Sequence, residues 1–214
     1  MRVAIAGGHG KIALRLTRLL RERGDQVRSL IRDPAQEDDV RQAGGEPVLC
    51  DLEAAGVEQV ADAIDAADAV VFAAGAGPGS GPARKDTMDY GGAAKLIGAA
   101  RERGIRRYLM VSAMGADPAR EGDETFAAYV RAKGRADAEL EASGLHHTIV
   151  RPGGLTDGPG TGRVRIGDHV GRGQVSRDDV AAVLLACLDD DSTIGRTFEL
   201  VSGDVPIEDT LRAL

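Results

Sequence analysis

The sequence predicts an α/β protein with a Rossmann-type, doubly wound parallel sheet in three layers. Three observations lead to this prediction. Short apolar runs alternate with segments of helical periodicity along most of the 214 residues. The first apolar run ends in a glycine-rich turn. Aromatic residues make up only 3% of the chain, so the core has to be built from Ala, Val, Leu and Ile, as in a parallel sheet covered by helices.

The first part of the chain is expected to form four strands with helices between them. Gly24 closes the first helix, Pro34 follows the second strand, and Gly44 stops the second helix. The fourth strand is apolar throughout, which places it at the centre of the sheet. The expected strands are 3–6, 26–31, 47–50 and 69–73, and the expected helices are 12–20, 38–43 and 57–64.

The middle of the chain continues the alternation, which predicts parallel strands with right-handed crossovers. A loop at 75–82 precedes a long helix at about 86–103, a strand at 108–111, a charged helix at 124–142 and a strand at 147–150.

The last third is less regular. Residues 153–162 are expected to form a loop, 164–166 one arm of a small strand pair, 197–201 a late strand and 206–214 a short helix. Ser176 and Asp179 resemble a capping box that opens a helix to about residue 188. The whole chain, 1–214, is interpreted as one domain, in which residues 153–214 form a small cap on the substrate side of the sheet.

Composition narrows the range of partners. The net charge of −7 argues against nucleic acid and anionic membranes, and no apolar run is long enough to span a bilayer. The apolar run at 3–6 is too short for a signal peptide. Cys50 and Cys187 lie in apolar stretches without a CxxC motif, which predicts two buried free thiols and a cytoplasmic protein. A small-molecule substrate and a monomer or homodimer are expected.

The turn after the first strand predicts a dinucleotide site. Its spacing fits either G-x-x-G-x-x-A, through Gly7 and Gly10, or G-x-G-x-x-A, through Gly8 and Gly10, and both patterns end at Ala13. Glycine permits a tight turn and a close approach of the backbone to a pyrophosphate, which then binds the free N–H groups of the helix. The cofactor-binding residues expected here are Gly7, Gly8, His9, Gly10, Lys11 and Ile12.

The end of the second strand favours NADP(H) over NAD(H). Arg32 follows Ile31, and a guanidinium can bind the 2′-phosphate of NADP with two hydrogen bonds. Asp33, one place further, could still reach a ribose. Ligands of such folds bind at the carboxyl ends of the strands. Asp51 and Leu52 are therefore expected near the adenine, and Ala73, Ala74 and Gly75 are expected to leave room for the cofactor.

A catalytic group is predicted from three residues. Ser112 ends the fifth strand, so it should face the same crevice as the cofactor. Tyr129 and Lys133 are four residues apart on a predicted helix and share one face. A nearby ammonium would lower the tyrosine pKa from its ordinary value of about 10. Tyr129 would then act as general acid or base on a carbonyl–alcohol pair, with Ser112 holding the substrate oxygen. No HExxH motif or Cys/His cluster indicates a metal site.

Together these motifs resemble the short-chain dehydrogenase/reductase superfamily, and within it the small atypical, epimerase/dehydratase-like NAD(P)H-binding proteins. The matching segments are 7–13, 51–52, 73–75, 111–116, 129–133 and 151–155. The resemblance implies catalytic positions at Ser112, Tyr129 and Lys133, and a nicotinamide pocket lined by Pro152 and Gly153. Where the family often has Asn, this chain has Asp89, which cannot donate a hydrogen bond when ionised.

The resemblance implies an NADP(H)-dependent oxidoreductase acting on a small carbonyl or alcohol, in one variant with epimerase- or dehydratase-like chemistry. Two alternatives remain open. One is a non-catalytic regulator that senses the redox state of NADP(H). The other is a flavin or tetrapyrrole reductase, which needs no tyrosine acid.

Overall fold

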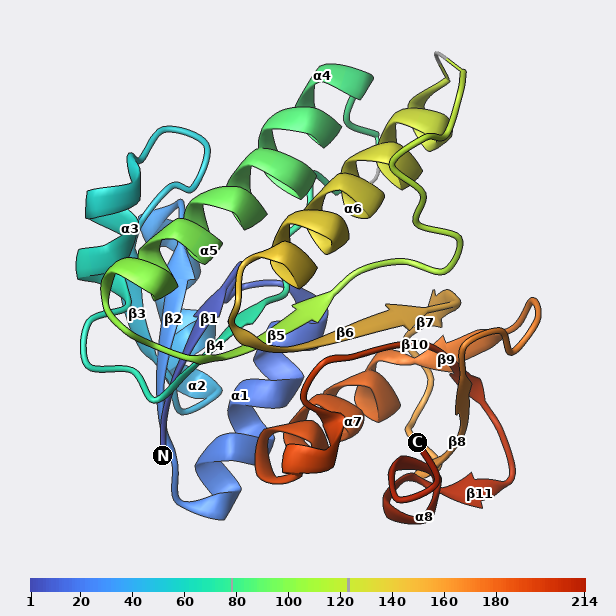
Figure 1. Cartoon of the computed structure of the whole chain (residues 1–214). Coiled ribbons are helices and arrows are strands. Elements are labelled where there is room, and N and C mark those ends of the chain that lie inside the picture. The colour runs from blue at the N-terminus through green and yellow to red at the C-terminus, as the bar shows by residue number, and fades with distance from the viewer. Residues whose placement is uncertain (78, 123) are drawn as a thin grey trace.

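Two stacks of helices enclose a mostly parallel sheet in the computed structural model, which describes residues 1–77, 79–122 and 124–214 (Figure 1). The sheet has nine strands in the order β11-β8-β10-β6-β5-β4-β1-β2-β3. These strands are β1 (Arg2–Ala6), β2 (Gln26–Ile31), β3 (Glu46–Leu49), β4 (Ala69–Phe72), β5 (Arg107–Val111), β6 (His146–Pro152), β8 (Arg163–Gly167), β10 (Arg196–Ser202) and β11 (Val205–Pro206). The predicted Rossmann-type fold is confirmed.

Helices cover both faces of this sheet (Figure 1). One face packs against α1 (Lys11–Arg23) and α7 (Arg177–Asp189), with the short α8 (Ile207–Leu211) beside them. The other face packs against α3 (Val57–Ala63), α5 (Gly91–Glu102) and α6 (Thr125–Ala142). The remaining helical segments are α2 (Glu37–Gln42), α4 (Pro82–Arg84), a π-helix (Lys85–Tyr90) and 3₁₀ turns at Pro34–Gln36 and Asp191–Thr193.

The strand order creates a crevice beside β1. From β1 the chain runs outward through β2 to β3, and it then returns to β4 on the other side of β1. The connections after β1 and β4 therefore leave in opposite directions, and space opens at the carboxyl ends of these two strands. The apolar sequences of the two central strands fit this arrangement. Ile5 of β1 pairs directly with Val71 of β4, and both side chains are fully buried.

The long helical segment after β4 differs from its predicted limits. It begins at Pro82, four residues before the expected start, because Gly81 adopts an extended N-cap conformation and proline is favoured in the first turn. Residues Lys85–Tyr90 then form a π-helical turn before α5 continues. A π turn inserts one extra residue into the helix and is frequent at functional sites.

The C-terminal segment was expected to cap the sheet, and its strands β8, β10 and β11 instead extend the sheet. β10 pairs parallel with β6, and β8 pairs antiparallel with β10. Burial explains this placement, since Val164, Phe198 and Leu200 join the core under α7. Only β7 (Gly154–Thr156) and β9 (Gln174–Ser176) form a separate two-stranded sheet, and β7 lies within the stretch expected to be loop.

Each edge strand of the large sheet contains a proline. In β3, Cys50 just beyond the strand donates to the Ile31 carbonyl, so the alternating geometry directs the backbone of Pro47 away from β2. In β11, Ile207 donates to Gly162, so Pro206 is likewise directed away from β8.

Several smaller features complete the fold. The cap of α7 is confirmed, because the Ser176 hydroxyl accepts a hydrogen bond from the Asp179 N–H at 2.9 Å. Cys50 and Cys187 are buried free thiols, as predicted. Within the described ranges, every helix is too short or too polar to cross a bilayer.

Candidate active site

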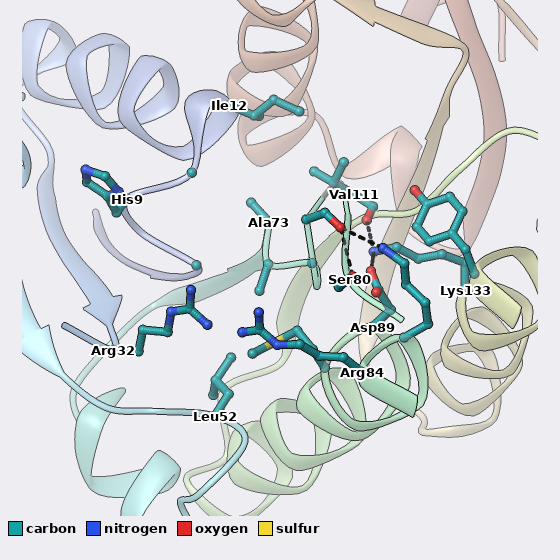
Figure 2. A pocket seen from close by; sticks show the side chains of 18 of the residues that line it. His9, Ile12, Arg32, Leu52, Ala73, Ser80, Arg84, Asp89, Val111 and Lys133 are labelled. Atoms are coloured by element: carbon teal, nitrogen blue, oxygen red, sulfur yellow. Dashed lines mark hydrogen bonds and ion pairs between the residues drawn. The ribbon is translucent and has the colours of Figure 1, made fainter. Parts of the chain in front are cut away.

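A cavity of about 750 Å³ opens at the carboxyl ends of the central strands, a size typical of ligand pockets. Most of the predicted site residues line it. Figure 2 shows Arg32 at one end and Lys133 with Asp89 at the other. The predicted residues that line the cavity are Gly7, His9, Gly10, Ile12, Arg32, Asp51, Leu52, Ala73, Ala74, Gly75, Asp89, Ser112, Tyr129 and Lys133.

The glycine turn lies against β2 and the end of β4. Gly7 has φ +78°, and a Cβ there would come within 2.6 Å of the Ala74 Cα. A Cβ on Gly8 would lie 2.4 Å from the Ser29 Cβ, so Gly8 serves the packing of the turn on β2. Gly10 is the N-cap of α1 and has no side chain to occupy the helix N–H groups. Gly7 and Gly10 line the cavity and Gly8 does not, which favours the G-x-x-G-x-x-A spacing.

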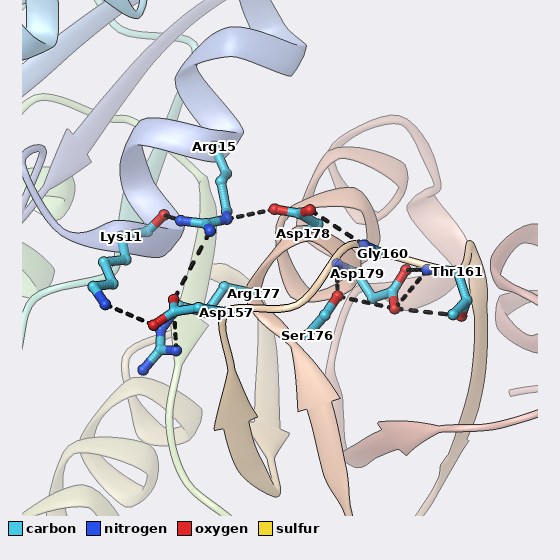
Figure 3. A network of polar contacts seen from close by, with 9 residues as sticks. All are labelled: Lys11, Arg15, Asp157, Gly160, Thr161, Ser176, Arg177, Asp178 and Asp179. Atoms are coloured by element: carbon cyan, nitrogen blue, oxygen red, sulfur yellow. Dashed lines mark hydrogen bonds and ion pairs between the residues drawn. The ribbon is translucent and has the colours of Figure 1, made fainter.

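Lys11, although it was expected to bind the cofactor, points elsewhere. Its ammonium donates to Asp157 at 2.7 Å, in the segment after β7. Asp157 also accepts from Arg177 at 2.9 Å and lies 3.8 Å from Arg15, as Figure 3 shows. The hydrogen bond from Lys11, together with the charges of Arg177 and Arg15, lowers the pKa of Asp157. Lys11 thus joins the start of α1 to the C-terminal segment.

Pro152 and Gly153 also lie outside the cavity lining. The Pro152 carbonyl accepts from the Met114 N–H at 3.0 Å, which holds the end of β6 to the segment after β5. A Cβ on Gly153 would come within 2.5 Å of the Gly173 carbonyl oxygen. These two residues therefore shape the backbone beside the cavity, and the structure does not place them at its wall.

Arg32 is exposed at the cavity wall, whereas the side chain of the neighbouring Asp33 forms a hydrogen bond outside the cavity. The Asp33 carboxylate accepts from the Ala35 N–H at 2.9 Å and caps the following 3₁₀ turn. Asp33 is absent from the cavity lining. Arg84, which the sequence did not single out, lines the cavity as well, and it donates to Glu53 at 2.8 and 3.0 Å. Arg32 and Arg84 reach into the cavity from separate walls (Figure 2).

Lys133 is held in place within the protein. It is 3% exposed, donates to the Val111 carbonyl at 3.1 Å and lies 3.5 Å from Asp89. Its ammonium also lies 5.3 Å from the centroid of the Phe72 ring. Asp89 is 1% exposed and accepts from the Ala76 N–H at 3.2 Å. At the position where the resemblance to the superfamily implies Asn, this chain therefore has a buried ion pair.

Lys133 acts on the pKa of Tyr129 in the expected direction, but the expected net lowering of that pKa is wrong. Burial raises the pKa of Tyr129, and this effect exceeds the opposing influence of Lys133. The carboxylates of Asp89 and Asp137 raise it further. Since Asp89 offsets part of the charge of Lys133, the phenol remains protonated at neutral pH and is suited to act as a proton donor.

Ser112 is bonded to a partner that the sequence analysis missed. Its hydroxyl donates to the Asp137 carboxylate at 2.8 Å, and the same oxygen accepts from the Arg151 Nε at 2.9 Å. Burial raises the pKa of Asp137, while Ser112 and Arg151 oppose that shift. The spacing along the sequence could have indicated Asp137. It follows Lys133 by four residues on α6, so Asp137, Lys133 and Tyr129 lie on the same face of that helix.

Further lining residues that the sequence analysis did not place in the site include Lys85, Phe126 and Leu155. Phe126 and Leu155 are exposed apolar side chains, 65% and 37% accessible. Phe126 forms a tilted aromatic pair with Tyr129, with 6.4 Å between ring centroids. In the described residues no group of His, Cys, Asp and Glu side chains is arranged to hold a metal ion.

The glycine turn, the crevice and the sheet order define a nicotinamide-dinucleotide-binding protein. The chain matches the NAD(P)H-binding family model over residues 7–191, and it therefore belongs to that family.

Particular relatives extend this assignment. The chain is 42% identical over 215 residues to the uncharacterized sugar epimerase YhfK of Bacillus subtilis (strain 168), with both chains covered completely. A Bacillus halodurans structure named as an NAD-dependent epimerase/dehydratase superposes with a TM-score of 0.92 at 38% identity, again over the whole of both chains. ChuY of Escherichia coli O157:H7, named as an anaerobillin reductase, gives a TM-score of 0.79 at 25% identity and covers 96% of this chain and 98% of its own.

Proposed function

We propose that this protein is an NADP(H)-dependent oxidoreductase that interconverts a small carbonyl compound and its alcohol. One observation carries the proposal: a protonated tyrosine, Tyr129, lines the same cavity as the glycine turn and Arg32. Membership of the NAD(P)H-binding family indicates a nicotinamide cofactor. Relatives named as a reductase and as an epimerase/dehydratase support chemistry at the nicotinamide rather than binding alone.

Each residue has a role that its contacts support. The N–H groups at the start of α1 would bind the pyrophosphate, because Gly10 leaves them free. When bound, NADPH supplies a hydride to the carbonyl carbon. Tyr129 would donate its phenolic proton to the carbonyl oxygen, so that the alcohol leaves neutral and the phenolate is reprotonated from solvent. Lys133, held by Asp89 and Val111, would stabilise that transient phenolate.

Arg32 would select NADP(H). A substitution of Arg32 by Ala should weaken NADPH binding by about tenfold or more, while it leaves NADH binding nearly unchanged, because only NADPH carries the 2′-phosphate. Fluorescence titration of the purified protein with each cofactor measures this directly. Arg18→Ala, which removes an exposed arginine from α1, is the matched control. Equal losses for NADPH and NADH in Arg32→Ala would remove Arg32 from 2′-phosphate recognition.

A second candidate function is a cofactor-dependent regulator without turnover. The hydrogen bond from Ser112 to Asp137 favours it, because a hydroxyl that donates to a carboxylate is not free to donate to a substrate carbonyl. This candidate requires tight binding of NADPH together with no NADPH oxidation across a panel of aldehydes, ketones and flavins. Oxidation of NADPH with any of them, abolished by Tyr129→Phe, would decide for the enzyme. Oxidation that survives in Tyr129→Phe with flavin or a linear tetrapyrrole would indicate a reductase without a tyrosine acid.

A further inference from the structure

Lys85 is a buried cation beside the proposed proton donor, and the mechanism above does not use it. It is 7% exposed and lines the cavity from the π-helix. Its ammonium lies 5.4 Å from the centroid of the Tyr129 ring and donates to the Gly77 carbonyl at 2.8 Å. A buried ammonium is costly unless an opposite charge accompanies it.

The described carboxylates near Lys85 are paired with other cations. Glu53 binds Arg84 at 2.8 Å, Asp86 is the partner of Arg135, and Asp89 lies beside Lys133. Within the described part of the chain, Lys85 forms no ion pair, and its polar contact is the neutral Gly77 carbonyl. The positive charge at this end of the cavity is therefore available to an anion that enters from solvent.

The cofactor has its own sites for its anionic groups. The pyrophosphate would bind the N–H groups after Gly10, and the 2′-phosphate would bind Arg32 at the far end of the cavity from Lys133 (Figure 2). Lys85 is at neither place, because it faces Tyr129, where the reacting carbonyl would be. The anion expected at Lys85 consequently belongs to the substrate.

The apolar residues around Lys85 indicate the chemistry of the rest of the substrate. Phe126 is 65% exposed, pairs with the Tyr129 ring and lines the cavity, as does Leu155 from β7. Exposed apolar side chains at a cavity with a few convergent polar groups are typical of small-molecule sites. Their combination with a buried cation that forms no ion pair among the described residues fits a molecule that has an apolar body and one negative charge.

Resting on the proposed function, we propose that the substrate is an apolar or aromatic oxo carboxylate, whose carboxylate binds Lys85 and whose carbonyl oxygen binds Tyr129. The ammonium lies 5.4 Å from the centroid of the Tyr129 ring, so a carboxylate bound to Lys85 would lie at the same part of the cavity as Tyr129. Lys85 is then a specificity residue that distinguishes a carboxylate from a neutral analogue of the same shape.

The test compares phenylglyoxylate with its neutral methyl ester, by calorimetric titration into protein saturated with NADP⁺, so that no reduction occurs. The unaltered protein should bind the carboxylate about tenfold more tightly than the ester, since a charge-assisted hydrogen bond is lost in the ester. Lys85→Met should abolish this preference and leave the Kd for NADPH unchanged. Lys85→Gln, which keeps a donor for the Gly77 carbonyl, should do the same and guards against misfolding of the first variant.

The control is Lys95→Met, since Lys95 also donates to backbone carbonyls, those of Leu52 and Glu53, but does not line the cavity. It should retain the preference for the carboxylate. Three outcomes overturn the inference: equal binding of the two probes, binding of neither, or weaker NADPH binding in both Lys85 variants. Failure of the unaltered protein to bind NADPH is a separate outcome, and it would reject the proposed function itself.

Discussion

The protonation state of Tyr129 results from a competition among burial, charged neighbours on its own helix and a carboxylate from another helix. Burial and the carboxylates of Asp89 and Asp137 raise its pKa, and Lys133 alone opposes them. The four-residue spacing of Tyr129 and Lys133 is readable from the sequence, and the structure places both at one cavity. The opposing carboxylate of Asp89 comes from another helix, so neither its distance nor the burial of the phenol could be derived from local spacing.

A rate profile against pH tests this protonation state. The acid form of Tyr129 is present below its pKa, and that pKa lies above the ordinary value of about 10. The rate of NADPH-dependent carbonyl reduction should therefore stay level through neutral pH and fall only in strongly alkaline solution. Tyr129→Phe should reduce kcat by about 10²- to 10⁴-fold, with NADPH binding retained. Tyr90→Phe, outside the cavity lining, is the control. A fall in rate near pH 7 would contradict the raised pKa.

At the scale of elements, the helix α7 shows how a local signal and a long-range contact combine. The Ser176 hydroxyl accepts from the Asp179 N–H, and it also donates to the Asp179 carboxylate at 3.0 Å. That carboxylate in turn accepts from the Thr161 N–H at 2.9 Å, as Figure 3 shows. It also accepts from the Gly162 N–H at 2.8 Å. The start of the helix was predictable from its capping residues, whereas its role in holding the preceding loop was not, because the loop lies some seventeen residues away.

Loss of this cap has a measurable cost. Ser176→Ala should lower the free energy of unfolding by about 1 kcal/mol, since it removes the hydrogen bond to the N–H of Asp179. Chemical denaturation followed by circular dichroism would show a lower midpoint with an unchanged slope. Ser192→Ala, at an exposed position in the 3₁₀ turn after α7, should leave the midpoint unchanged. Equal shifts for the two variants would show that the cap hydrogen bond adds nothing specific.

At the scale of the whole molecule, the alternation of strands and helices up to β6 was predictable because each unit is local and strongly periodic. In the C-terminal segment the strands at 164–166 and 197–201 and the helix to about residue 188 were predicted as elements. Their place in the large sheet was not, because the strands are short and the partner of β8 lies about thirty residues further along the chain. Val164 and Phe198 become core residues only when these strands meet. The π turn at Lys85–Tyr90 has no recognised sequence signal, and it carries the cation of the proposed substrate site.

Truncation of the chain tests whether the C-terminal segment is a removable cap or an integral part of the sheet. A chain ending at Gly153 would lose β10 from the side of β6 and α7 from the side of α1, which exposes buried residues such as Leu16. It should be insoluble, or should unfold without a cooperative transition, in contrast to the full chain. Size-exclusion chromatography and thermal denaturation measure this. A monomeric fragment that unfolds cooperatively and binds NADPH would restore the interpretation of residues 154–214 as a cap.

The prolines of the two edge strands determine how the molecule meets other copies of itself. A free strand edge offers N–H and C=O groups that can template a strand from a neighbouring molecule. At Pro47 in β3 and Pro206 in β11 the outward backbone position has no N–H to donate. Continuous sheets across molecules are therefore disfavoured at both ends of the nine-stranded sheet.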